Sequence, residues 1–541
     1  MKIVILDGYV DEPSNLGVPP FISPYPRYLA GAITDAGHEY KYLTIDRVRE
    51  GARLKGDIFV VISGPIVPGK YIRGMPASEK ELLSLASSFK GTKVLGGPLS
   101  RFRKYDVGTA KAYDYVARRD LDACIYDLLV NGKFDDRDRS MDEWGRWAVQ
   151  GAKVVTHHPD FPEPLIVELD LSKGCVRYLT GGCSFCIEPM YGAPKFRQVE
   201  TIVDEVKELA SYGVVNFRLG GTADIFSYMA DGIGRTPTPK PNVAILKELL
   251  TGIRNAAPGL KVFHTDNADP AIIAAHPDEA TATLKELIKN TTPGNILSLG
   301  METADPAVVD ANNLNATAEM SLEAVRLINT VGRERGENGL PYLLPGLNFV
   351  LGLDGETTRT FELNLKFLKN VLDEGLLVRR VNIRQVSSVR REFDMRNRRM
   401  FRSFKNSVRI KFDHEMLERV VPTGTVMRSV YTEIKEGKTT FGRQVGTYPL
   451  LIGIPYTIVL GSFINVKVTG HGQRSVTAIE YPLDVNHSPM AALAAIPGIG
   501  AKRAARIVRA RPIKSKKELE SCLDEPAIAF AVATYLDLPA R

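Results

Sequence analysis

Three of the five cysteines in this chain lie within one short stretch, and that stretch constrains the chain more than any other feature. Cys175 and Cys183 are separated by seven residues, and Cys183 and Cys186 by two. The apolar run LIVELDL stands just before them and is typical of a buried strand. We therefore expect the cysteines on the loop that leaves this strand. The double glycine before Cys183 would let the backbone pass closely around a bulky group.

Three thiolates on one loop suit an iron–sulfur cluster or a zinc ion. A [4Fe–4S] cluster normally takes four cysteines, so three would leave one iron open to a substrate or cofactor. A structural zinc site usually needs a fourth Cys or His. Thiols that share a loop without a common ligand are the third alternative.

The loop resembles that of the radical S-adenosylmethionine (SAM) superfamily. Phe185, the residue before the last cysteine, is the aromatic typical of that motif, whereas the long first gap departs from the usual spacing of three and then two residues. The resemblance implies that Cys175, Cys183 and Cys186 hold a [4Fe–4S] cluster whose open iron chelates SAM. A reductant such as ferredoxin or flavodoxin would then supply the electron that splits SAM into methionine and a 5′-deoxyadenosyl radical.

Later strand ends carry further parts of the same resemblance. Gly220 and Gly221 end a predicted strand where the superfamily places a glycine pair against the SAM amino group. Glu302 follows another strand and would reach the SAM ribose or amino group. GLDGET resembles a turn of the methylthiotransferases, with Asp354 in place of proline, and its Gly352 would flank the adenine. Each of these glycine-containing strand ends alone fits an ordinary turn. Three of them in register at the ends of successive strands favour a SAM site.

Strand and helix patterns predict an α/β protein of several domains. Residues 1–150 alternate short apolar strands with helices, which predicts a doubly wound parallel sheet. Residues 151–421 contain six strand candidates with amphipathic helices between them, which fits the partial (β/α)6 barrel of radical SAM enzymes. A length of 541 residues is compatible with three or four domains at roughly 100–200 residues each.

The first domain resembles the cobalamin-binding or methylthiotransferase domains that precede many radical SAM barrels. The histidine that often ligates cobalt is missing after the first strand. A second cluster would need three more cysteines, and only Cys124 lies in this domain. The domain has lost its ligand, binds a corrinoid near Gly96 and Gly97, or takes another ligand. Cobalamin is thus a possible cofactor.

The chain after the barrel predicts affinity for a polyanion. Ten arginines lie between residues 379 and 409, interleaved with phenylalanines, and form either a solvated helical face or a strip that contacts phosphates. Residues 422–485 alternate apolar and polar positions and resemble the small TRAM β-barrel, a nucleic-acid-binding module, with Arg443 as a contact. A barrel that only packs against its neighbours is the alternative.

Residues 486–541 resemble a helix-hairpin-helix motif. The turn through Gly498 and Gly500, with the next helix N-terminus, can receive a phosphate without reading bases. Lys502 and Arg503 then lie on or near the same side. Some motifs of this kind mediate only protein contacts. The whole arrangement resembles a group of archaeal radical SAM proteins that end in a helix-hairpin-helix.

These patterns predict an enzyme, not merely a binding protein. No apolar run approaches the ~18 residues of a membrane span. Five cysteines, three of them clustered, favour a reducing compartment, the cytoplasm. We expect a radical SAM enzyme that modifies a nucleic acid, with tRNA favoured over other substrates and methylation over methylthiolation. Modification or repair of DNA or of a protein, and a nucleic-acid-binding protein with a structural cluster, are the alternatives.

Overall fold

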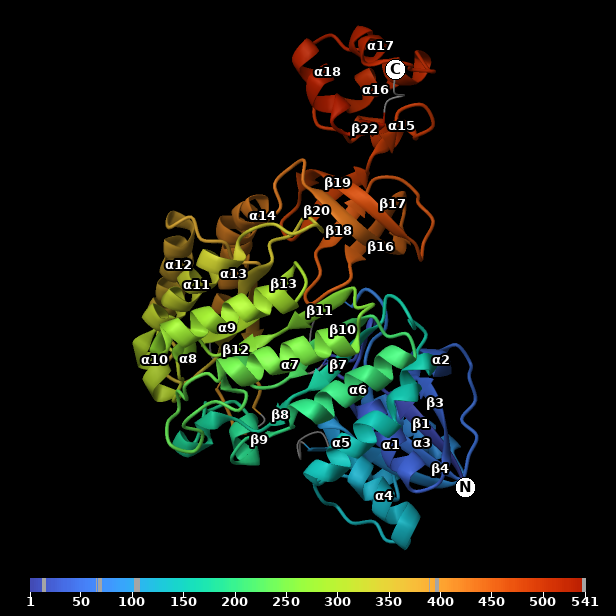
Figure 1. Ribbon diagram of the computed structural model, residues 1–541, viewed down its shortest axis with the longest axis vertical. Helices are drawn as coiled ribbons and strands as arrows, with labels where there is room; N and C mark the ends of the chain where they lie inside the picture. Colours follow the sequence, from blue (N-terminus) through green and yellow to red (C-terminus); the bar gives the residue numbers. More distant parts are fainter. Residues whose placement is uncertain are drawn as a thin grey trace.

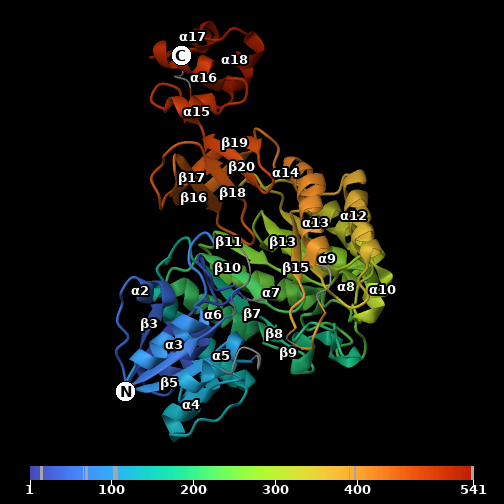
Figure 2. The ribbon, with the colours of Figure 1, turned by 180° about the vertical axis from the view of Figure 1, so that it is seen from behind.

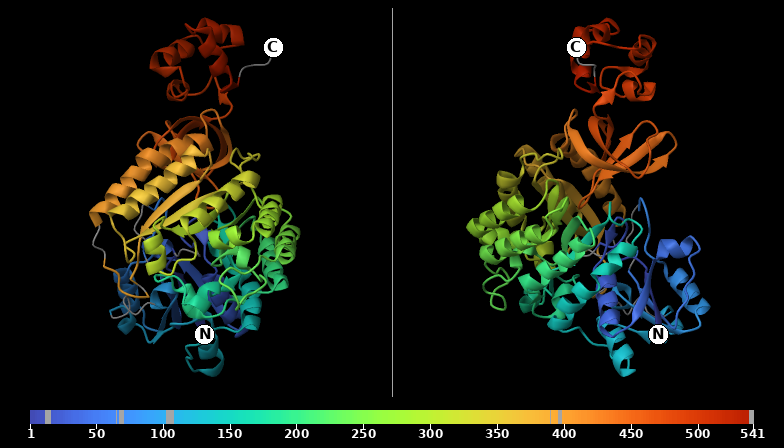
Figure 3. Two further views of the ribbon diagram at one scale, coloured as in Figure 1. Left: turned by 90° about the vertical axis from the view of Figure 1, so that its left-hand side faces the viewer. Right: turned by 45° about the vertical axis from the view of Figure 1, so that its right-hand side comes forward.

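The computed structural model arranges the chain as four parts along one long axis (Figure 1). The N-terminal domain lies beside a large α/β barrel at one end, and a small β-barrel joins them to a helical module at the other end. Figure 3 shows the small β-barrel between the large barrel and the helical module. The structure describes residues 1–11, 16–64, 66, 71–101, 108–388, 390–394 and 398–537.

The N-terminal domain is a parallel sheet of five strands with helices on both faces, as the sequence predicts. The first strand of the chain lies inside this sheet. The second strand of the sheet pairs with one of its edges, and all later strands of the sheet lie on its other side. The strand order is β3 (Glu39–Thr44), β1 (Lys2–Asp7), β4 (Ile58–Ile62), β5 (Thr92–Gly96) and β6 (Tyr115–Val116). The helices are α1 (Tyr25–Asp35), α2 (Ile45–Arg49), α3 (Glu79–Ser88), α4 (Leu121–Asn131) and α5 (Met141–Gln150).

The large barrel contains the six predicted parallel strands. They form two four-stranded sheets that meet at Asp266, where one predicted strand is split in two. An extra edge strand, β2 (Phe21–Ile22), comes from the N-terminal part of the chain and pairs with β7. The barrel strands are β7 (Ile166–Asp170), β10 (Asn216–Gly221), β11 (Val262–Thr265) continued as β12 (Asn267–Ala268), β13 (Asn295–Glu302), β14 (Leu343–Leu351) and β15 (Arg380–Gln385).

Amphipathic helices cover the outside of the large barrel. The sequence predicts amphipathic helices between the strands, and the long helices lie there. Two short helices, α8 (Pro270–Ala275) and α10 (Pro306–Ala311), begin at a proline after a strand end. The long helices are α6 (Val199–Ser211), α7 (Val243–Ala256), α9 (Pro277–Asn290), α11 (Ala318–Gly332) and α12 (Thr358–Asp373).

The N-terminal domain and the large barrel are joined through helix α1. Inside the N-terminal domain α1 packs closely on α5, where a side chain at Gly31 would meet the backbone oxygen of Trp147 at 2.0 Å, so only glycine permits this approach. Across the domain boundary, Glu205 of α6 accepts hydrogen bonds from Arg27 of α1 and from Arg197, both at 2.5 Å. All three side chains are buried, and the two domains therefore share a buried ionic network.

The segment after the last barrel strand packs along the outer wall of the barrel (Figures 2 and 3). It forms α13 (Arg398–Val408), a π-helical turn (Arg409–Asp413) and α14 (His414–Val420). Phe404 is buried between Phe349 and Phe361, and Phe393 is buried as well. These phenylalanines belong to the core, whereas Arg399 and Arg402 are exposed.

The small β-barrel is closed and has five strands. Its order, in which the first strand meets the second and the fourth, is that of the OB-fold barrel. The strands are β16 (Val426–Glu436), β17 (Thr439–Gln444), β18 (Leu451–Ile454), β20 (Ser475–Glu480) and β19 (Phe463–His471).

The C-terminal module consists of four short helices. A pair of two-residue strands, β21 (Leu483–Asp484) and β22 (Leu536–Asp537), closes its base. The helices are α15 (Met490–Ala494), α16 (Gly500–Arg509), α17 (Lys516–Ser521) and α18 (Pro526–Ala533).

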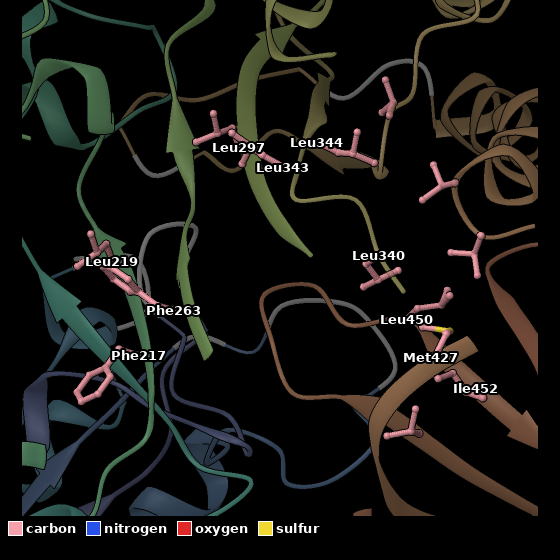
Figure 4. Close-up of a cluster of buried hydrophobic side chains, with 14 of the residues drawn as sticks. Phe217, Leu219, Phe263, Leu297, Leu340, Leu343, Leu344, Met427, Leu450 and Ile452 are labelled. Carbon is pink, nitrogen blue, oxygen red and sulfur yellow. The ribbon is translucent and has the colours of Figure 1, made fainter. Parts of the chain in front are cut away.

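One apolar core runs through the domains. Figure 4 follows it from Phe217 and Phe263 in the large barrel to Leu343, and on to Met427 and Ile452 in the small one. The small barrel is thus packed against the large barrel rather than tethered to it. Within the described residues, no helix has the length and apolar character needed to cross a membrane.

Candidate active site

The three cysteines lie on a loop that leaves β7 and returns beside it. The short strands β8 (Ser172–Lys173) and β9 (Lys195–Phe196) pair antiparallel and close the base of this loop. Between them, two 3-10 turns carry residues 176–180 and 188–191. The loop lies at the carboxyl ends of the barrel strands, where barrel enzymes place their sites.

Side chains from distant parts of the chain hold the cysteine loop in shape. Arg177 donates hydrogen bonds to the Oδ1 atoms of Asn315 (2.6 Å) and Asn313 (2.9 Å). The Asn313 amide in turn donates to the carbonyl oxygens of Thr180 (2.8 Å) and Gly182 (2.9 Å). The asparagines that follow α10 therefore fix the backbone just before the second cysteine.

A second clamp comes from the segment after the last barrel strand. Arg390 donates to the backbone oxygens of Cys183 (2.9 Å) and Gly181 (2.7 Å). Its neighbour Arg391 pairs with Asp354 at 2.7 Å. Arg390 of the basic segment is therefore engaged at the cysteine loop, and the exposed Arg391 beside it is engaged at the turn after β14.

All three thiols have their proton affinity increased by the site. Burial raises the pKa of Cys175 to about 12 and that of Cys183 to about 11, and raises the pKa of Cys186 well above its usual range. Only the thiolate ligates a metal, so a bound cation is needed to draw the protons off. Three half-buried thiols on one fixed loop fit that requirement.

One side of the cysteine loop is covered by apolar side chains. Among the residues the structure describes, no three His, Cys, Asp or Glu side chains form a group that could hold a single metal ion. Phe185 and Cys183 pack against an apolar group that includes Val308 and Leu353, which shields this side of the loop.

Glycines open the strand ends next to the cysteine loop. Gly221 is the last residue of β10, and a side chain there would lie 1.6 Å from Oδ1 of Asp170, so no other residue fits. Gly220 precedes it in the same strand. Gly352 follows β14 with φ of +92°, a conformation that favours glycine, and its N–H donates to Glu356 at 2.8 Å.

Carboxylates gather at the same strand ends. Glu302 ends β13 with φ of +62°, and its Oε2 is buried with no hydrogen-bond partner in the described structure. Burial raises the pKa of Glu302 to about 8, with Arg384 opposing and Asp269 reinforcing the effect. Asp224 also has a buried oxygen without a partner. SAM carries an ammonium and a sulfonium group, which such carboxylates would attract.

The sequence-predicted cysteines and strand-end residues thus come together, but several residues of the site were not predicted. Asp224 and Asp269 each follow a strand end, a position that could have marked them. Arg177, Asn313 and Arg390 act through contacts between residues 131 to 209 positions apart, for which the sequence gives no signal.

The residues predicted to bind nucleic acid lie at the other end of the molecule. Arg443 forms two hydrogen bonds of 2.9 Å with Glu433. Arg503 pairs with Asp524 and Glu525 and also donates to the backbone oxygen of Gly498. A phosphate would have to compete with these carboxylates, so the role of both arginines stays a prediction. Gly500 begins α16, and Lys502 is exposed on it.

The small β-barrel covers the amino ends of the barrel strands, opposite the cysteine loop (Figures 1 and 2). Thr447 donates its N–H to Nδ1 of His264 at 2.9 Å, and Gln444 donates to the backbone oxygen of Asn338, which precedes β14. Strands of eight or nine residues span roughly 25–30 Å. The cysteine loop and the predicted nucleic-acid modules are therefore separated by at least the length of the barrel.

The switch point of the N-terminal sheet, where such folds bind cofactors, is filled by side chains. Tyr9 and Tyr42 are buried at the strand ends, and the Tyr42 hydroxyl donates to Asp7 at 2.8 Å. Around Gly97 the described residues leave a cavity of about 10 Å³, and a side chain at Gly96 would meet Leu121. The described residues around Gly96 and Gly97 therefore leave no room for a corrinoid ring, while residues 65, 67–70 and 102–107, which follow β4 and β5, lie outside the described part of the chain.

A larger polar cavity of about 60 Å³ lies between the N-terminal domain and the cysteine loop. Its charges are balanced: Asp120, for example, pairs with Arg139 at 3.3 Å and with Lys173 at 3.2 Å. We call this space the cluster-end cavity. Its basic residues are Arg101, Arg139, Lys173 and Lys195, and its acidic residues are Asp120, Asp138, Asp170 and Glu188.

A cysteine loop at the open end of a six-stranded α/β barrel defines the class of radical SAM proteins. The family model described as the Radical SAM superfamily matches residues 171–368. The chain belongs to this superfamily and is an enzyme of the radical SAM type.

Three relatives show the range of similarity. An uncharacterized protein from Methanocaldococcus jannaschii is 42% identical over 511 residues, which cover 88% of this chain and 92% of that protein. A ribosomal protein uS12 methylthiotransferase from Caldanaerobacter subterraneus is 24% identical and covers 62% of this chain and 72% of its own. A tRNA-2-methylthio-N(6)-dimethylallyladenosine synthase from Agrobacterium fabrum is 26% identical and covers 57% and 63%.

Proposed function

We propose that this radical SAM enzyme modifies an unactivated carbon of a nucleic acid, with tRNA as the favoured substrate and methylation as the favoured reaction. The observation that carries the reaction class is the cysteine loop beside a buried carboxylate without a partner, Glu302, at the same strand ends. The choice of nucleic acid rests on the basic C-terminal modules, and the choice of methylation rests on the cysteine count.

Cys175, Cys183 and Cys186 are the residues that would hold the [4Fe–4S] cluster. When bound and reduced by a protein such as ferredoxin or flavodoxin, the cluster supplies the electron for reductive cleavage of SAM, which generates the radical. The chain's own residues prepare the site for this chemistry. Arg177 and Arg390 fix the loop backbone, and an apolar group covers one side of the half-buried Cys183.

Binding of SAM falls to the strand ends. Gly352 leaves the backbone partly exposed at the end of β14, while Glu302 and Asp269 provide negative charge for a cationic ligand. Because Glu302 is buried and lacks a hydrogen-bond partner for Oε2, an ammonium or hydroxyl donor would relieve an uncompensated polar group. This is why we assign Glu302 to SAM rather than to the substrate.

The cysteine count favours methylation. One of the relatives is a methylthiotransferase by name and another is named as a synthase of a 2-methylthio nucleoside of tRNA. Related methylthiotransferases use a second cluster, held by three further cysteines, as the sulfur donor. Outside the loop this chain has only Cys124 and Cys522. Cys124 is buried in α4, where burial raises its pKa and its Sγ lies 3.7 Å from Asp136. These two cysteines cannot replace a set of three. No step of the proposed reaction uses a corrinoid.

Three features of the C-terminal half support a nucleic acid as the substrate. The small β-barrel has the strand order of OB-fold barrels, many of which bind oligonucleotides. The turn through Gly498 and Gly500 leads into α16, whose N-terminal amides can receive a phosphate. Lys502, Arg506 and Arg509 are exposed on that helix. Modification of DNA or of a protein is the rival proposal, since one relative is named for a ribosomal protein.

Comparison of tRNA nucleosides by mass spectrometry tests this proposal. A strain that lacks the protein should lose one methylated nucleoside, and the wild-type chain but not a Cys183→Ala variant should restore it. Loss of a methylthio nucleoside would reverse the order of the two reactions. Unchanged tRNA would reject tRNA as the substrate, and absence of 5′-deoxyadenosine from the reduced, reconstituted protein would reject enzymatic SAM cleavage in favour of a structural cluster.

Whether a corrinoid is present is tested separately. Protein purified from cobalamin-fed cells should show no corrinoid absorbance once iron has been removed, because the described residues around Gly96 and Gly97 leave no room for the ring. Stoichiometric corrinoid would contradict this expectation while still agreeing with methylation.

A further inference from the structure

A second polar cavity lies at the amino ends of the barrel strands, where β15, the turn after α13 and the small β-barrel meet. Its volume is about 310 Å³, within the range of small-ligand sites, and it lies between domains, where such sites often occur. We call it the interdomain cavity. Its charged and aromatic lining consists of Arg379, Arg380, Asp413, Tyr448 and Arg474, together with Phe412.

The three arginines have too little negative charge around them. Arg379 donates to the backbone oxygen of Tyr448 at 3.0 Å and forms no ion pair with a described carboxylate. Burial, together with the charges of Arg380 and Arg474, lowers the pKa of Arg379 to about 10. A cation that costs this much free energy to keep charged would gain from a bound anion.

Arg380 is oriented but not satisfied. Its guanidinium lies 4.1 Å from the centroid of the Tyr448 ring, which fixes the plane of the group. Nη2 makes only a long contact of 3.4 Å with Asn382, and Nε is buried with no hydrogen-bond partner in the described structure. A buried donor of this kind is normally paired, so its state indicates a missing acceptor.

The remaining charges do not restore the balance. Asp413 is the only carboxylate among the described residues of the lining, and it lies 3.9 Å from Nε of Arg474. Two more cations add positive charge nearby. Arg409 interacts electrostatically with Asp413, and Lys405 interacts with Arg409 and Arg474. Acidic neighbours of Arg380 outside the lining are already used: Asp266 pairs with Arg218, and Asp11 accepts from Tyr71.

We propose that the interdomain cavity binds a phosphate group through Arg379, Arg380 and Arg474, and that this phosphate belongs to the backbone of the nucleic-acid substrate. Planar guanidinium groups match phosphate oxygens in pairs, which suits this lining. The second half of the statement rests on the proposed function, and it places a substrate contact at the end of the barrel opposite the cysteine loop. Helix α13 runs along the outer wall of the barrel, and its Arg399 and Arg402 are exposed (Figure 3).

Binding of inorganic pyrophosphate to the full-length, cluster-loaded protein, followed by calorimetry, tests the site itself. Arg474→Gln should weaken binding about tenfold, because one charge-assisted contact is lost. Arg474→Lys should recover part of this loss. Asp413→Asn should tighten binding about threefold, because it removes the carboxylate that opposes the anion. Arg359→Gln, the same change at an exposed arginine of α12, is the matched control and should bind like the wild type.

The same variants are then measured with a short single-stranded oligoribonucleotide. Parallel weakening by Arg474→Gln, with a smaller salt dependence, supports a backbone phosphate. If the variants change pyrophosphate binding but leave RNA binding unchanged, the bound phosphate does not belong to the RNA backbone. The cavity is then assigned to a free phosphorylated ligand. If Arg474→Gln and Asp413→Asn both leave the pyrophosphate affinity unchanged, and both variants melt like the wild type, the proposal of a phosphate site in this cavity is rejected. Neither result depends on which nucleoside the enzyme modifies.

Discussion

Two polar cavities at opposite ends of the barrel differ in how their charges are balanced. In the cluster-end cavity, four basic side chains face four acidic ones, and Asp120 alone contacts Arg101, Arg139 and Lys173. In the interdomain cavity, three arginines share Asp413. Buried charges need partners. The first cavity is therefore complete and holds two domains together, whereas the second is complete only when an anion is bound.

The largest effect is expected from loss of the cluster, whose three cysteine ligands lie at one end of the barrel only. Cys183→Ala should lower reductive SAM cleavage by at least about 1,000-fold, because the cluster loses a ligand and the radical chemistry belongs to the cofactor. Iron content and 5′-deoxyadenosine yield measure the effect. Cys522→Ala, at the opposite end, should retain one [4Fe–4S] cluster per chain and full cleavage. Full SAM cleavage by the Cys183→Ala variant would contradict the assignment of Cys183 as a cluster ligand.

The balanced cavity should be sensitive to the loss of one charge. Asp120→Asn should lower the free energy of unfolding by about 3 kcal/mol, because Arg139 and Lys173 are left partly unpaired. Urea unfolding measures the change. Asp142→Asn, an exposed partner of Arg146, is the control and should cost at most about 0.5 kcal/mol.

The pH dependence of this effect has a definite sign. Burial would raise the pKa of Asp120, but Arg139, Lys173 and Arg101 hold it well below its ordinary value. The group therefore contributes stability above its unfolded pKa of about 3.9, and this contribution is lost as the pH falls through the lower folded pKa. The wild type and the Asn variant should become equally stable only in strong acid. Equal stability at pH 7 would show that the network is not structural.

A third prediction concerns the polyanion affinity assigned to the far end. Removing the three exposed cations of α16 should weaken RNA binding about tenfold, to a similar extent for all sequences, because phosphate contacts release counterions. Filter binding at several salt concentrations measures the affinity and its salt slope. The variant is Lys502→Gln, Arg506→Gln and Arg509→Gln combined. The control neutralises three exposed lysines of α7 and α9, Lys247, Lys285 and Lys289. Equal weakening by both variants would mean that only net charge matters.

The smallest effect is expected at Asp413 in the interdomain cavity. There, removing the carboxylate charge should raise the stability, whereas at Asp120 it should lower it. Burial raises the pKa of Asp413 to about 6, despite the opposing charges of Arg474, Arg409 and Arg380. An acid whose folded pKa is raised costs stability as the pH rises from about 4 to about 6. Asp413→Asn should therefore be about 1 kcal/mol more stable than the wild type at pH 7 and no more stable at pH 4. A loss of stability at pH 7 would show that this cavity is also balanced.

Local patterns in the sequence predict the strands and most of the helices, because burial and period determine each of them. The cysteines, Gly221 and Glu302 were found in the same way, since each lies directly at a strand end. What could not be predicted depends on contacts across the chain. Arg443 is paired with Glu433 and Arg503 with Asp524, and no local signal separates an arginine that binds phosphate from one that is already paired.

The phenylalanines of the basic segment show the same limit. Phe393 and Phe404 look in the sequence like aromatic contacts between arginines, yet both belong to the core. The positive φ of Glu302 is also invisible in the sequence, because only the packed strand end imposes it. The charge imbalance of the interdomain cavity arises from three segments and exists only in the folded chain.

The edge strand β2 has a consequence for how these domains could be inherited or separated. Phe21 and Ile22 pair with Ile166 and Val167, so the first part of the chain completes a sheet whose other strands come after residue 165. A chain that began at residue 151 would leave β7 as an unprotected edge, open to pairing with other molecules. The N-terminal domain therefore cannot be exchanged between relatives like an independent module. Recombination at the apparent domain boundary would break the barrel, so the two parts must evolve as one unit.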